Sequence, residues 1–205
     1  MSTVPPSLMD REKMILCVCG LAGSGKSTVA KRLARHYKLK YLSGGDALKA
    51  VAADMGYKVT CKGWWESEEG RRFIEERERN LEIDRKVDEK LLEWARKGGV
   101  VLDSWAIPWL VKEGFKVWLE ASENERARRV AHRDGLSLED AVRFIREKEE
   151  KTKAIYKKLY GFNLGEDFTP FNLIIDVENL DKDEVYQALR MVIDNLVLKE
   201  KHSGA

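Results

Sequence analysis

Long apolar runs and a set of paired cysteines are absent from this sequence. No apolar stretch approaches the roughly 18 residues that a membrane-spanning helix requires. The three cysteines, Cys17, Cys19 and Cys61, are too few for a disulfide framework, and a C-x-C pair alone is not a metal site. Residues 1–10 lack the pattern of a secretory signal peptide. We therefore expect a cytoplasmic protein without a membrane partner.

Histidine and excess charge of either sign are also scarce. The three histidines, His36, His132 and His202, do not have the spacing of a catalytic triad or a metal site. Lys and Arg number 37 against 35 for Asp and Glu, and this net charge of +2 does not favour a nucleic-acid partner. A chain of 205 residues suffices for one α/β domain with its own core. We expect a monomer that binds small molecules.

The most specific motif is a glycine-rich loop between a predicted strand and a predicted helix. The apolar run 14–19 predicts a buried strand, and the spacing of Val29, Leu33 and Tyr37 predicts a helix over 26–37. The loop matches G-x-x-x-x-G-K-[ST], whose glycines let backbone N–H groups converge on a phosphate at a helix N-terminus. The alternative is a glycine-rich turn without a ligand. The residues expected to bind ATP are Gly20, Leu21, Ala22, Gly23, Ser24, Gly25, Lys26, Ser27 and Thr28.

Five short apolar runs alternate with helical patterns along the chain. This alternation predicts an α/β fold with a five-stranded parallel sheet and helices on both faces. Ligands of such folds bind at the carboxyl ends of the strands, where Gly20, Gly44, Asp103, Glu120 and Val177 should gather. Strands are predicted at 14–19, 40–43, 100–103, 115–119 and 172–176, and helices at 26–37, 47–54, from 67, and at 82–97, 122–133, 137–160 and 181–197.

Two insertions and two loose ends complete the expected organisation. We expect a flexible arm over residues 1–12, one domain around the glycine-rich loop over 13–197, and a frayed tail over 198–205. Residues 45–80 are expected to form an insertion, which Gly44-Gly45 separates from the second strand and in which Asp46 caps the first helix. Residues 134–168 form a lid, with hinges at Gly135, Gly161 and Gly165.

Charged residues near the strand ends suggest phosphoryl-transfer chemistry. Asp103 ends a buried strand, where it can hold Mg²⁺ through water together with Ser27, or serve only as a turn residue. Cations on the lid helices can offset the charge of a moving phosphoryl group, unless they belong to a solvated face with Glu147, Glu149 and Glu150. These cations are Arg126, Arg129 and Arg133 on one face, Arg146 and Lys153 on another, and Lys148 and Lys151 beside them.

The first insertion and the tryptophans are candidates for the acceptor side. A basic residue in or after the insertion can bind an acceptor phosphate, and the candidates on this side are Gly45, Asp46, Lys49, Arg71, Arg72 and Asp88. Aromatic rings can stack on a base, although ordinary packing explains any single tryptophan equally well. The tryptophans concerned are Trp64, Trp65, Trp105 and Trp109.

The ordered set of motifs resembles archaeal-type cytidylate kinases, a branch of the nucleoside monophosphate kinases, over roughly residues 13–197. The resemblance implies transfer of the γ-phosphoryl group of ATP to CMP, with dCMP as a second acceptor, in the presence of Mg²⁺. It is carried by the phosphate loop, Leu42-Ser43-Gly44-Gly45-Asp46, Glu82-Ile83-Asp84-Arg85, Val100-Val101-Leu102-Asp103, Glu125-Arg126-Ala127-Arg128-Arg129, Arg133-Asp134-Gly135, Arg146-Glu147-Lys148-Glu149-Glu150 and Tyr160-Gly161.

The same resemblance implies roles for individual residues. Lys26 would hold the β- and γ-phosphates, Lys49 the acceptor phosphate, and Arg129 would lie near the ATP base. Arg133, Arg146 and Lys148 would clamp the transferred group. The chain departs from the family where Asp103-Ser104-Trp105 replaces the common Glu-Gly-Arg, and where lysine replaces arginine at 49 and 148.

Two other functions fit the same core. The first is a kinase of another small metabolite, which would need a carboxylate base near the acceptor hydroxyl, with Asp46 as the candidate. The second is a nucleotide-dependent interaction module with slow ATPase activity. Such a module would hydrolyse ATP without an acceptor and would bind a larger complex.

Overall fold

The computed structural model describes residues 12–59, 64 and 68–198. The predicted arm before residue 12, Cys61, Trp65 and the tail from 199 lie outside these residues. Across the described chain, every helix is too short or too polar to cross a membrane.

The core of the molecule is one sheet of five parallel strands in the order β2-β3-β1-β4-β5, as the sequence predicts. The central strand β1 pairs with β3 on one side and with β4 on the other. The chain changes direction across the sheet at β1, and such switch points open a crevice for ligands. The strands are β1 (Ile15–Cys19), β2 (Lys40–Ser43), β3 (Val100–Asp103), β4 (Phe115–Glu120) and β5 (Leu173–Asp176).

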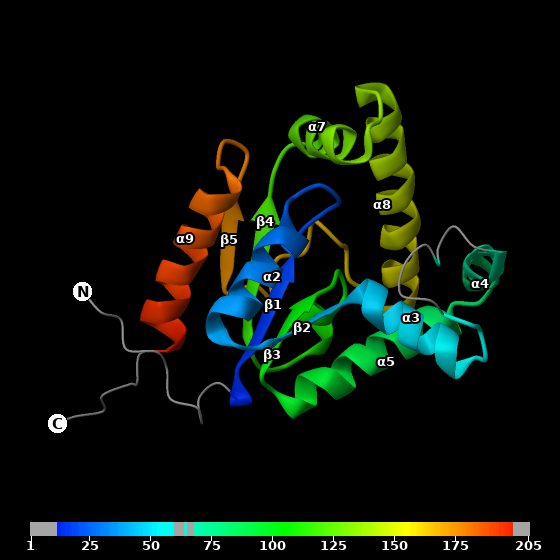
Figure 1. The fold of residues 1–205 in the computed structure, drawn as a ribbon, viewed down its shortest axis with the longest axis horizontal. Helices are drawn as coiled ribbons and strands as arrows, with labels where there is room; N and C mark the ends of the chain where they lie inside the picture. The colour runs from blue at the N-terminus through cyan, green and yellow to red at the C-terminus, as the bar shows by residue number, and fades with distance from the viewer. Residues whose placement is uncertain (1–11, 60–63, 65–67, 199–205) are drawn as a thin grey trace.

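Side chains of β1 alternate between two apolar layers. Leu16 and Val18 pack beneath α2 (Lys26–Tyr37) and α9 (Lys182–Val192). Cys17 and Cys19 share the opposite face, which confirms that both are small core residues. Figure 1 shows α2 and α9 on one side of the sheet. The remaining helices are α3 (Gly44–Asp54), α4 (Glu68–Arg79), α5 (Glu82–Lys97), α6 (Ile107–Leu110), α7 (Glu123–Asp134) and α8 (Leu138–Tyr160).

The start of α3 differs from the prediction. Gly44 and Gly45 form the first helical turn instead of a break, because both have backbone conformations compatible with the helix. Ser43 is the N-cap, so the prediction that Asp46 caps the helix is wrong. Asp46 is the third helical residue, and its carboxylate accepts hydrogen bonds from the Ser43 N–H and hydroxyl while the Ser43 oxygen accepts from the Asp46 N–H.

Two further elements were not predicted correctly. The short helix α6 follows β3 and begins at Ile107 with Pro108 in its first turn, a position that proline tolerates. The predicted last helix, 181–197, is α9 followed by the π-helical segment η1 (Ile193–Val197). Apolar spacing does not distinguish α9 from η1, because an α-helix and a π-helical turn bury nearly the same stripe of side chains.

The tryptophans Trp64 and Trp109 are packing residues. Trp64 is 1% exposed beneath α3 and α5. Trp109 stacks on Phe162, with ring centroids 4.2 Å apart, and its indole N–H donates to Asp167. Packing therefore explains the positions of these two rings.

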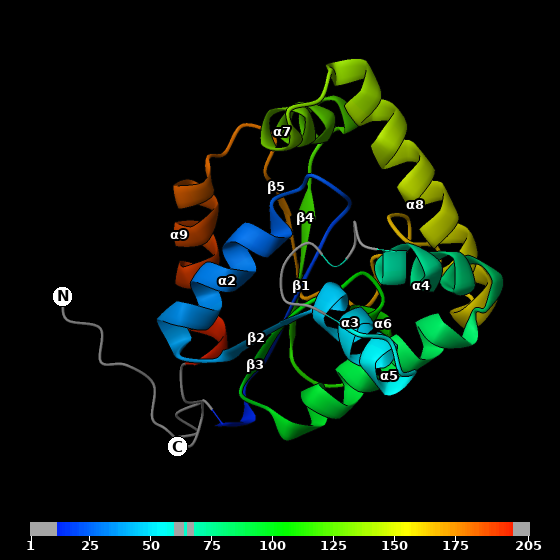
Figure 2. The ribbon, with the colours of Figure 1, turned by 45° about the vertical axis from the view of Figure 1, so that its right-hand side comes forward.

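A polar cluster with buried carboxylates joins α4 and α5 to the C-terminal end of α8. Arg77 of α4 pairs with Asp84 of α5 at 2.7 Å, and the Tyr160 hydroxyl of α8 donates to Asp88 of α5 at 2.9 Å. Figure 2 shows α4 and α5 beside the end of α8. Asp88 is 2% exposed, and burial raises its pKa to about 7, with Asp84 adding repulsion and Tyr160 and Arg77 opposing the shift. The folded protein thus holds a proton that the unfolded chain releases at lower pH.

This proton makes stability depend on pH. The contribution of Asp88 is complete below its ordinary pKa of about 3.9 and is lost as pH rises towards the folded pKa. We expect the free energy of unfolding of the wild-type protein to fall between pH 5 and pH 8. That of Asp88→Asn should fall less, because asparagine keeps an acceptor for Tyr160 and cannot ionise. The difference should be a few kcal/mol, at about 1.4 kcal/mol per pKa unit.

Urea unfolding at both pH values measures this difference. Glu89→Gln, at an exposed position one residue further along α5, is the matched control and should keep the wild-type dependence. A wild-type pH dependence in Asp88→Asn would show that Asp88 is ionised in the folded state.

Candidate active site

The phosphate loop connects β1 to α2 and is closely surrounded by backbone. A Cβ at Gly20 would lie 2.6 Å from the Leu119 carbonyl oxygen, and one at Gly23 would collide with the Arg126 carbonyl. Both glycines are therefore required by space as well as by their positive φ angles. Helix α2 has Gly25 as its N-cap and no side-chain cap among the described residues, which leaves N–H groups of its first turn available to an anion.

A cavity of about 890 Å³ opens beside this loop. Its walls come from the loop and the first turn of α2, from α7, and from the segment between β5 and α9. Its volume is in the range of small-molecule sites. Outside the loop the polar and charged lining residues are Glu125, Arg128, Arg129, His132, Arg133, Glu178, Asn179, Asp181 and Lys182.

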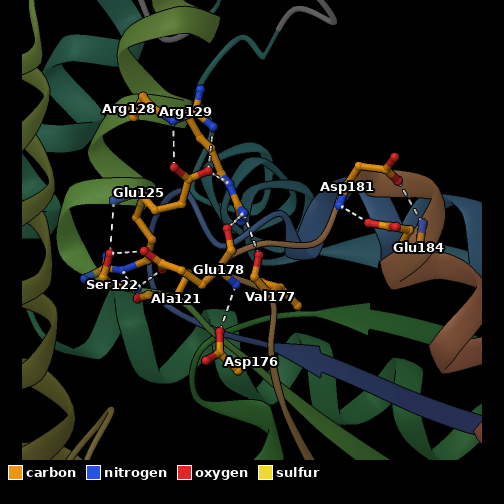
Figure 3. A network of polar contacts seen from close by, with 11 residues as sticks. Ala121, Ser122, Glu125, Arg128, Arg129, Asp176, Val177, Glu178, Asp181 and Glu184 are labelled. Atoms are coloured by element: carbon orange, nitrogen blue, oxygen red, sulfur yellow. Dashed lines mark hydrogen bonds and ion pairs between the residues drawn. The ribbon is translucent and has the colours of Figure 1, made fainter.

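Arg129 ties two walls of this cavity together (Figure 3). Its guanidinium donates to Glu125 at 2.7 Å on its own helix and to the Val177 carbonyl at 2.6 Å beyond β5. Glu178 completes the connection, because its carboxylate accepts from the N–H and hydroxyl of Ser122, each at 2.7 Å. Hydrogen bonds from Arg128 and Arg129 lower the pKa of Glu125 to about 2, so it stays ionised. The structure thus places Arg129 in the cavity wall, and its contact with the ATP base remains a prediction.

Lys26, Asp103 and Ser27 meet at the floor of the site. The Lys26 ammonium donates to the Leu21 carbonyl at 3.4 Å, and burial lowers its pKa while Asp103 opposes that shift. The Tyr41 hydroxyl donates to Asp103 at 2.8 Å and lies beside the hydroxyl of Ser27. The strand-end carboxylate is therefore next to the phosphate loop, as predicted.

This arrangement fits a magnesium ion that arrives with a nucleotide. Within the described residues, no three His, Cys, Asp or Glu side chains form a metal cluster. Mg²⁺ bound to nucleotides takes one or two protein ligands and completes its octahedron with phosphate oxygens and water. The Ser27 hydroxyl and the Asp103 carboxylate meet that requirement.

Two further predicted cations lie near Lys26. Desolvation lowers the pKa of Lys148, and the neighbouring charges of Lys26 and Arg133 lower it further. Arg133 lines the cavity and pairs with Asp134 at 2.6 Å. The structure therefore gathers positive charge from the loop, α7 and α8 around one point.

The remaining predicted residues lie elsewhere in this form. Arg146 is exposed and pairs with Glu123 at 2.6 Å, and Arg72 is exposed and pairs with Glu68 at 3.4 Å. The first turns of α3 carry Gly45, Asp46 and the half-buried Lys49. Lys153 lies on α8 close to Gly165. The structure does not test the roles of these residues, which remain predictions.

The sequence did not reveal that Arg126 and Glu149 form a buried ion pair. They are 5% and 7% exposed, and the Arg126 guanidinium also donates to the carbonyls of Ala22 at 3.0 Å and Ala121 at 3.1 Å. Glu149 accepts the Ala22 N–H at 3.2 Å. The pair thus fixes both polar groups of one loop residue. A signal was present, because Glu149 continues the buried stripe of Ala141 and Ile145 at four-residue spacing.

Comparisons with known proteins agree with this geometry. The cytidylate kinase-like family matches residues 15–179. The cytidylate kinase of Pyrococcus horikoshii is 34% identical over 189 residues, covering 92% of each protein. That of Pyrobaculum aerophilum is 36% identical over 183 residues, covering 88% of this chain and 91% of the relative.

Solved structures share the fold at lower identity. Shikimate kinase from Bacteroides thetaiotaomicron superposes with a TM-score of 0.57 at 18% identity, covering 90% of this chain and 99% of that structure. An uncharacterised protein from Eubacterium ventriosum gives a TM-score of 0.64 at 18% identity, with 89% and 99% coverage. These likenesses concern the fold alone.

The buried pair generates a stability prediction. Glu149→Gln leaves the Arg126 charge buried without a carboxylate, and breaking a buried pair in this way costs about 3–5 kcal/mol. We expect a loss of that size in the free energy of unfolding, measured by urea denaturation. The exposed neighbour Glu147→Gln is the matched control and should unfold at the wild-type midpoint. Equal midpoints for the two variants would contradict the inferred role of the pair.

Proposed function

The chain belongs to the cytidylate kinase-like family and is a kinase, and we propose that it transfers the γ-phosphoryl group of ATP to CMP, giving ADP and CDP. The observation that carries this proposal is the cavity at the phosphate loop, next to the positive group of Lys26, Arg133 and Lys148. The names of the relatives support a nucleoside monophosphate as the acceptor and cytosine as its base. We propose dCMP as a second acceptor.

The donor nucleotide would occupy the cavity between α2 and α7. Its phosphates would be held by the backbone N–H groups of the loop and by Lys26, and its base would lie towards Arg129 and the 178–182 segment. Arg133 and Lys148 would offset the charge that spreads over the phosphoryl oxygens during transfer. The acceptor is itself an ionised phosphate, so the reaction requires no general base.

Ser27 and Asp103, the latter through water, would hold Mg²⁺ at the floor of the site. The ion would neutralise part of the charge on the β- and γ-phosphates. The acceptor would enter from the side of α3, where Gly45, Asp46, Lys49 and Arg72 are the proposed contacts. Asp103, at the carboxyl end of the neighbouring strand β3, and Trp105 after it are the other proposed contacts. Arg146 and Lys153 would join only when the 134–168 segment closes.

The competing proposal of a metabolite kinase needs a free carboxylate base. Its candidate, Asp46, is engaged with the N–H and hydroxyl of Ser43 at 2.9 Å and 2.7 Å. A carboxylate that takes part in such a capping box points at the backbone of its own helix N-terminus. The geometry therefore favours the monophosphate acceptor.

An acceptor survey tests the main proposal. We expect ADP release in a coupled assay to be fastest with CMP, followed by dCMP, and slower with UMP, AMP and GMP. Lys26→Ala should lower kcat by roughly 10³-fold, because the charge that holds the transferred group is removed. The thermal midpoint of the variant serves as its folding control. Absence of turnover with every monophosphate, or acceptor-independent ATP hydrolysis alone, would refute the proposal.

Asp46→Asn distinguishes the two kinase proposals. Asparagine retains an acceptor for the Ser43 groups but cannot take a proton from a hydroxyl. We expect kcat with CMP within about three-fold of wild type, since loss of a general base costs roughly 10²–10⁴-fold. A loss in that larger range at an unchanged thermal midpoint would favour a hydroxyl acceptor.

A further inference from the structure

Trp105 lies at the centre of the positive group, directly after β3. Its ring centroid is 5.5 Å from the ammonium nitrogen of Lys26 and 5.6 Å from that of Lys148. One of these lysines belongs to the phosphate loop and the other to α8. A single aromatic ring thus contacts two cations from segments far apart in the sequence.

We propose that Trp105 is a positioning residue that holds Lys26 and Lys148 together through its π face, so that a polyphosphate meets two ammonium groups already in place. This inference rests on the proposed phosphoryl transfer and names a residue through which its cations are arranged. Two ammonium groups repel each other, and the negative face of an indole is the side-chain surface that attracts both without neutralising either. A carboxylate in the same place would compete with the phosphate for the cations.

The charges of the site support this role. Lys26 is among the charges that lower the pKa of Lys148, which shows that the two groups interact. Lys148 also lies 5.8 Å from the ring centroid of Phe144, so it is placed between two aromatic rings. Glu149, an acid of the same helix whose charge acts on Lys148, is already engaged with Arg126. The aromatic rings thus take part in placing Lys148.

Packing holds the ring in place. Trp105 contacts the cluster that contains Cys19, Trp118 and Tyr156, and also the cluster of Ala22 and Ile145. The Cys19 thiol donates to the Trp105 carbonyl at 3.6 Å, and burial raises the pKa of this thiol so that it keeps its proton. The indole N–H is buried and has no acceptor within the described residues. The orientation of the ring therefore comes from apolar contacts, and replacing Trp105 by phenylalanine removes no hydrogen bond of its side chain.

The proposal differs from two simpler explanations. If the position only required a side chain that could contact a phosphate, an arginine at 105 should preserve or improve activity. If Trp105 only packed the core, a leucine of sufficient bulk should work as well as phenylalanine. If the ring holds two lysines, a third cation between them should be harmful and only an aromatic ring should substitute.

Three variants of the full chain separate these explanations: Trp105→Phe, Trp105→Leu and Trp105→Arg. We expect kcat/KM with ATP and CMP within about three-fold of wild type for phenylalanine, and a fall of roughly 10–100-fold for leucine and for arginine. Trp94→Phe on α5 is the matched control for loss of an indole and should retain wild-type kinetics. Thermal midpoints identify any variant that fails to fold. If Trp105→Leu fails to fold, the comparison of Trp105→Phe with Trp105→Arg still tests the proposal.

A second measurement reads the lysines without turnover. Calorimetric titration with Mg·ATP should show wild-type affinity for phenylalanine and about ten-fold weaker binding for leucine, since the charge of Lys26 is then no longer placed. The proposal would be overturned if Trp105→Leu kept wild-type affinity and kinetics, or if Trp105→Arg had a higher kcat/KM than wild type. If the wild-type protein turned over none of the acceptors, the proposed function would be refuted instead. The Mg·ATP affinities of the variants would still test the role of Trp105.

Discussion

The phosphate loop depends on one buried ion pair. Arg126 of α7 and Glu149 of α8 bind each other and, between them, both polar groups of the Ala22 backbone. An isolated buried charge would be costly. Here the two side chains pair with each other and also form hydrogen bonds with the carbonyl and N–H of Ala22. The pair therefore supports the loop from below and links both α7 and α8 to it. The loop and α7, two of the walls of the cavity, are thereby joined through Arg126.

The same construction decides where charge collects. The loop contributes Lys26, α7 contributes Arg133 and α8 contributes Lys148, and one tryptophan ring contacts the first and last of them. Arg129 links α7 to the segment after β5, which closes the other side of the cavity. Because Glu149 fastens the middle of α8 to the loop, movement of the 134–168 segment would have to occur on either side of that point. The glycines at 135 and 161, which end α7 and α8 with positive φ angles, lie on those two sides.

Much of the architecture follows from local patterns. The β-branched and apolar run before Gly20 predicts the central strand, and the spacing after Gly25 predicts α2 with its observed bounds. The long helix α5 also has its predicted bounds, since Gly98 ends it in a conformation that favours glycine. Local patterns predicted element boundaries less well where a glycine is compatible with two conformations. Gly44 and Gly45 can end a strand or begin a helix, and the reciprocal hydrogen bonds of Ser43 and Asp46 favour the helix.

The sequence by itself determined the parallel sheet, the phosphate loop and the position of Asp103 at a strand end, because each depends on periodicity or on a short motif with its own backbone geometry. Only the tertiary structure decided which charges line the cavity and which are buried behind it. Arg126 and Arg133 are alike in sequence, yet one is a buried support and the other lines the cavity. Trp64 and Trp105 are equally alike, yet one fills the core and the other contacts two lysines. The role of a long charged or aromatic side chain depends on what packs around it, and those neighbours come from distant parts of the chain.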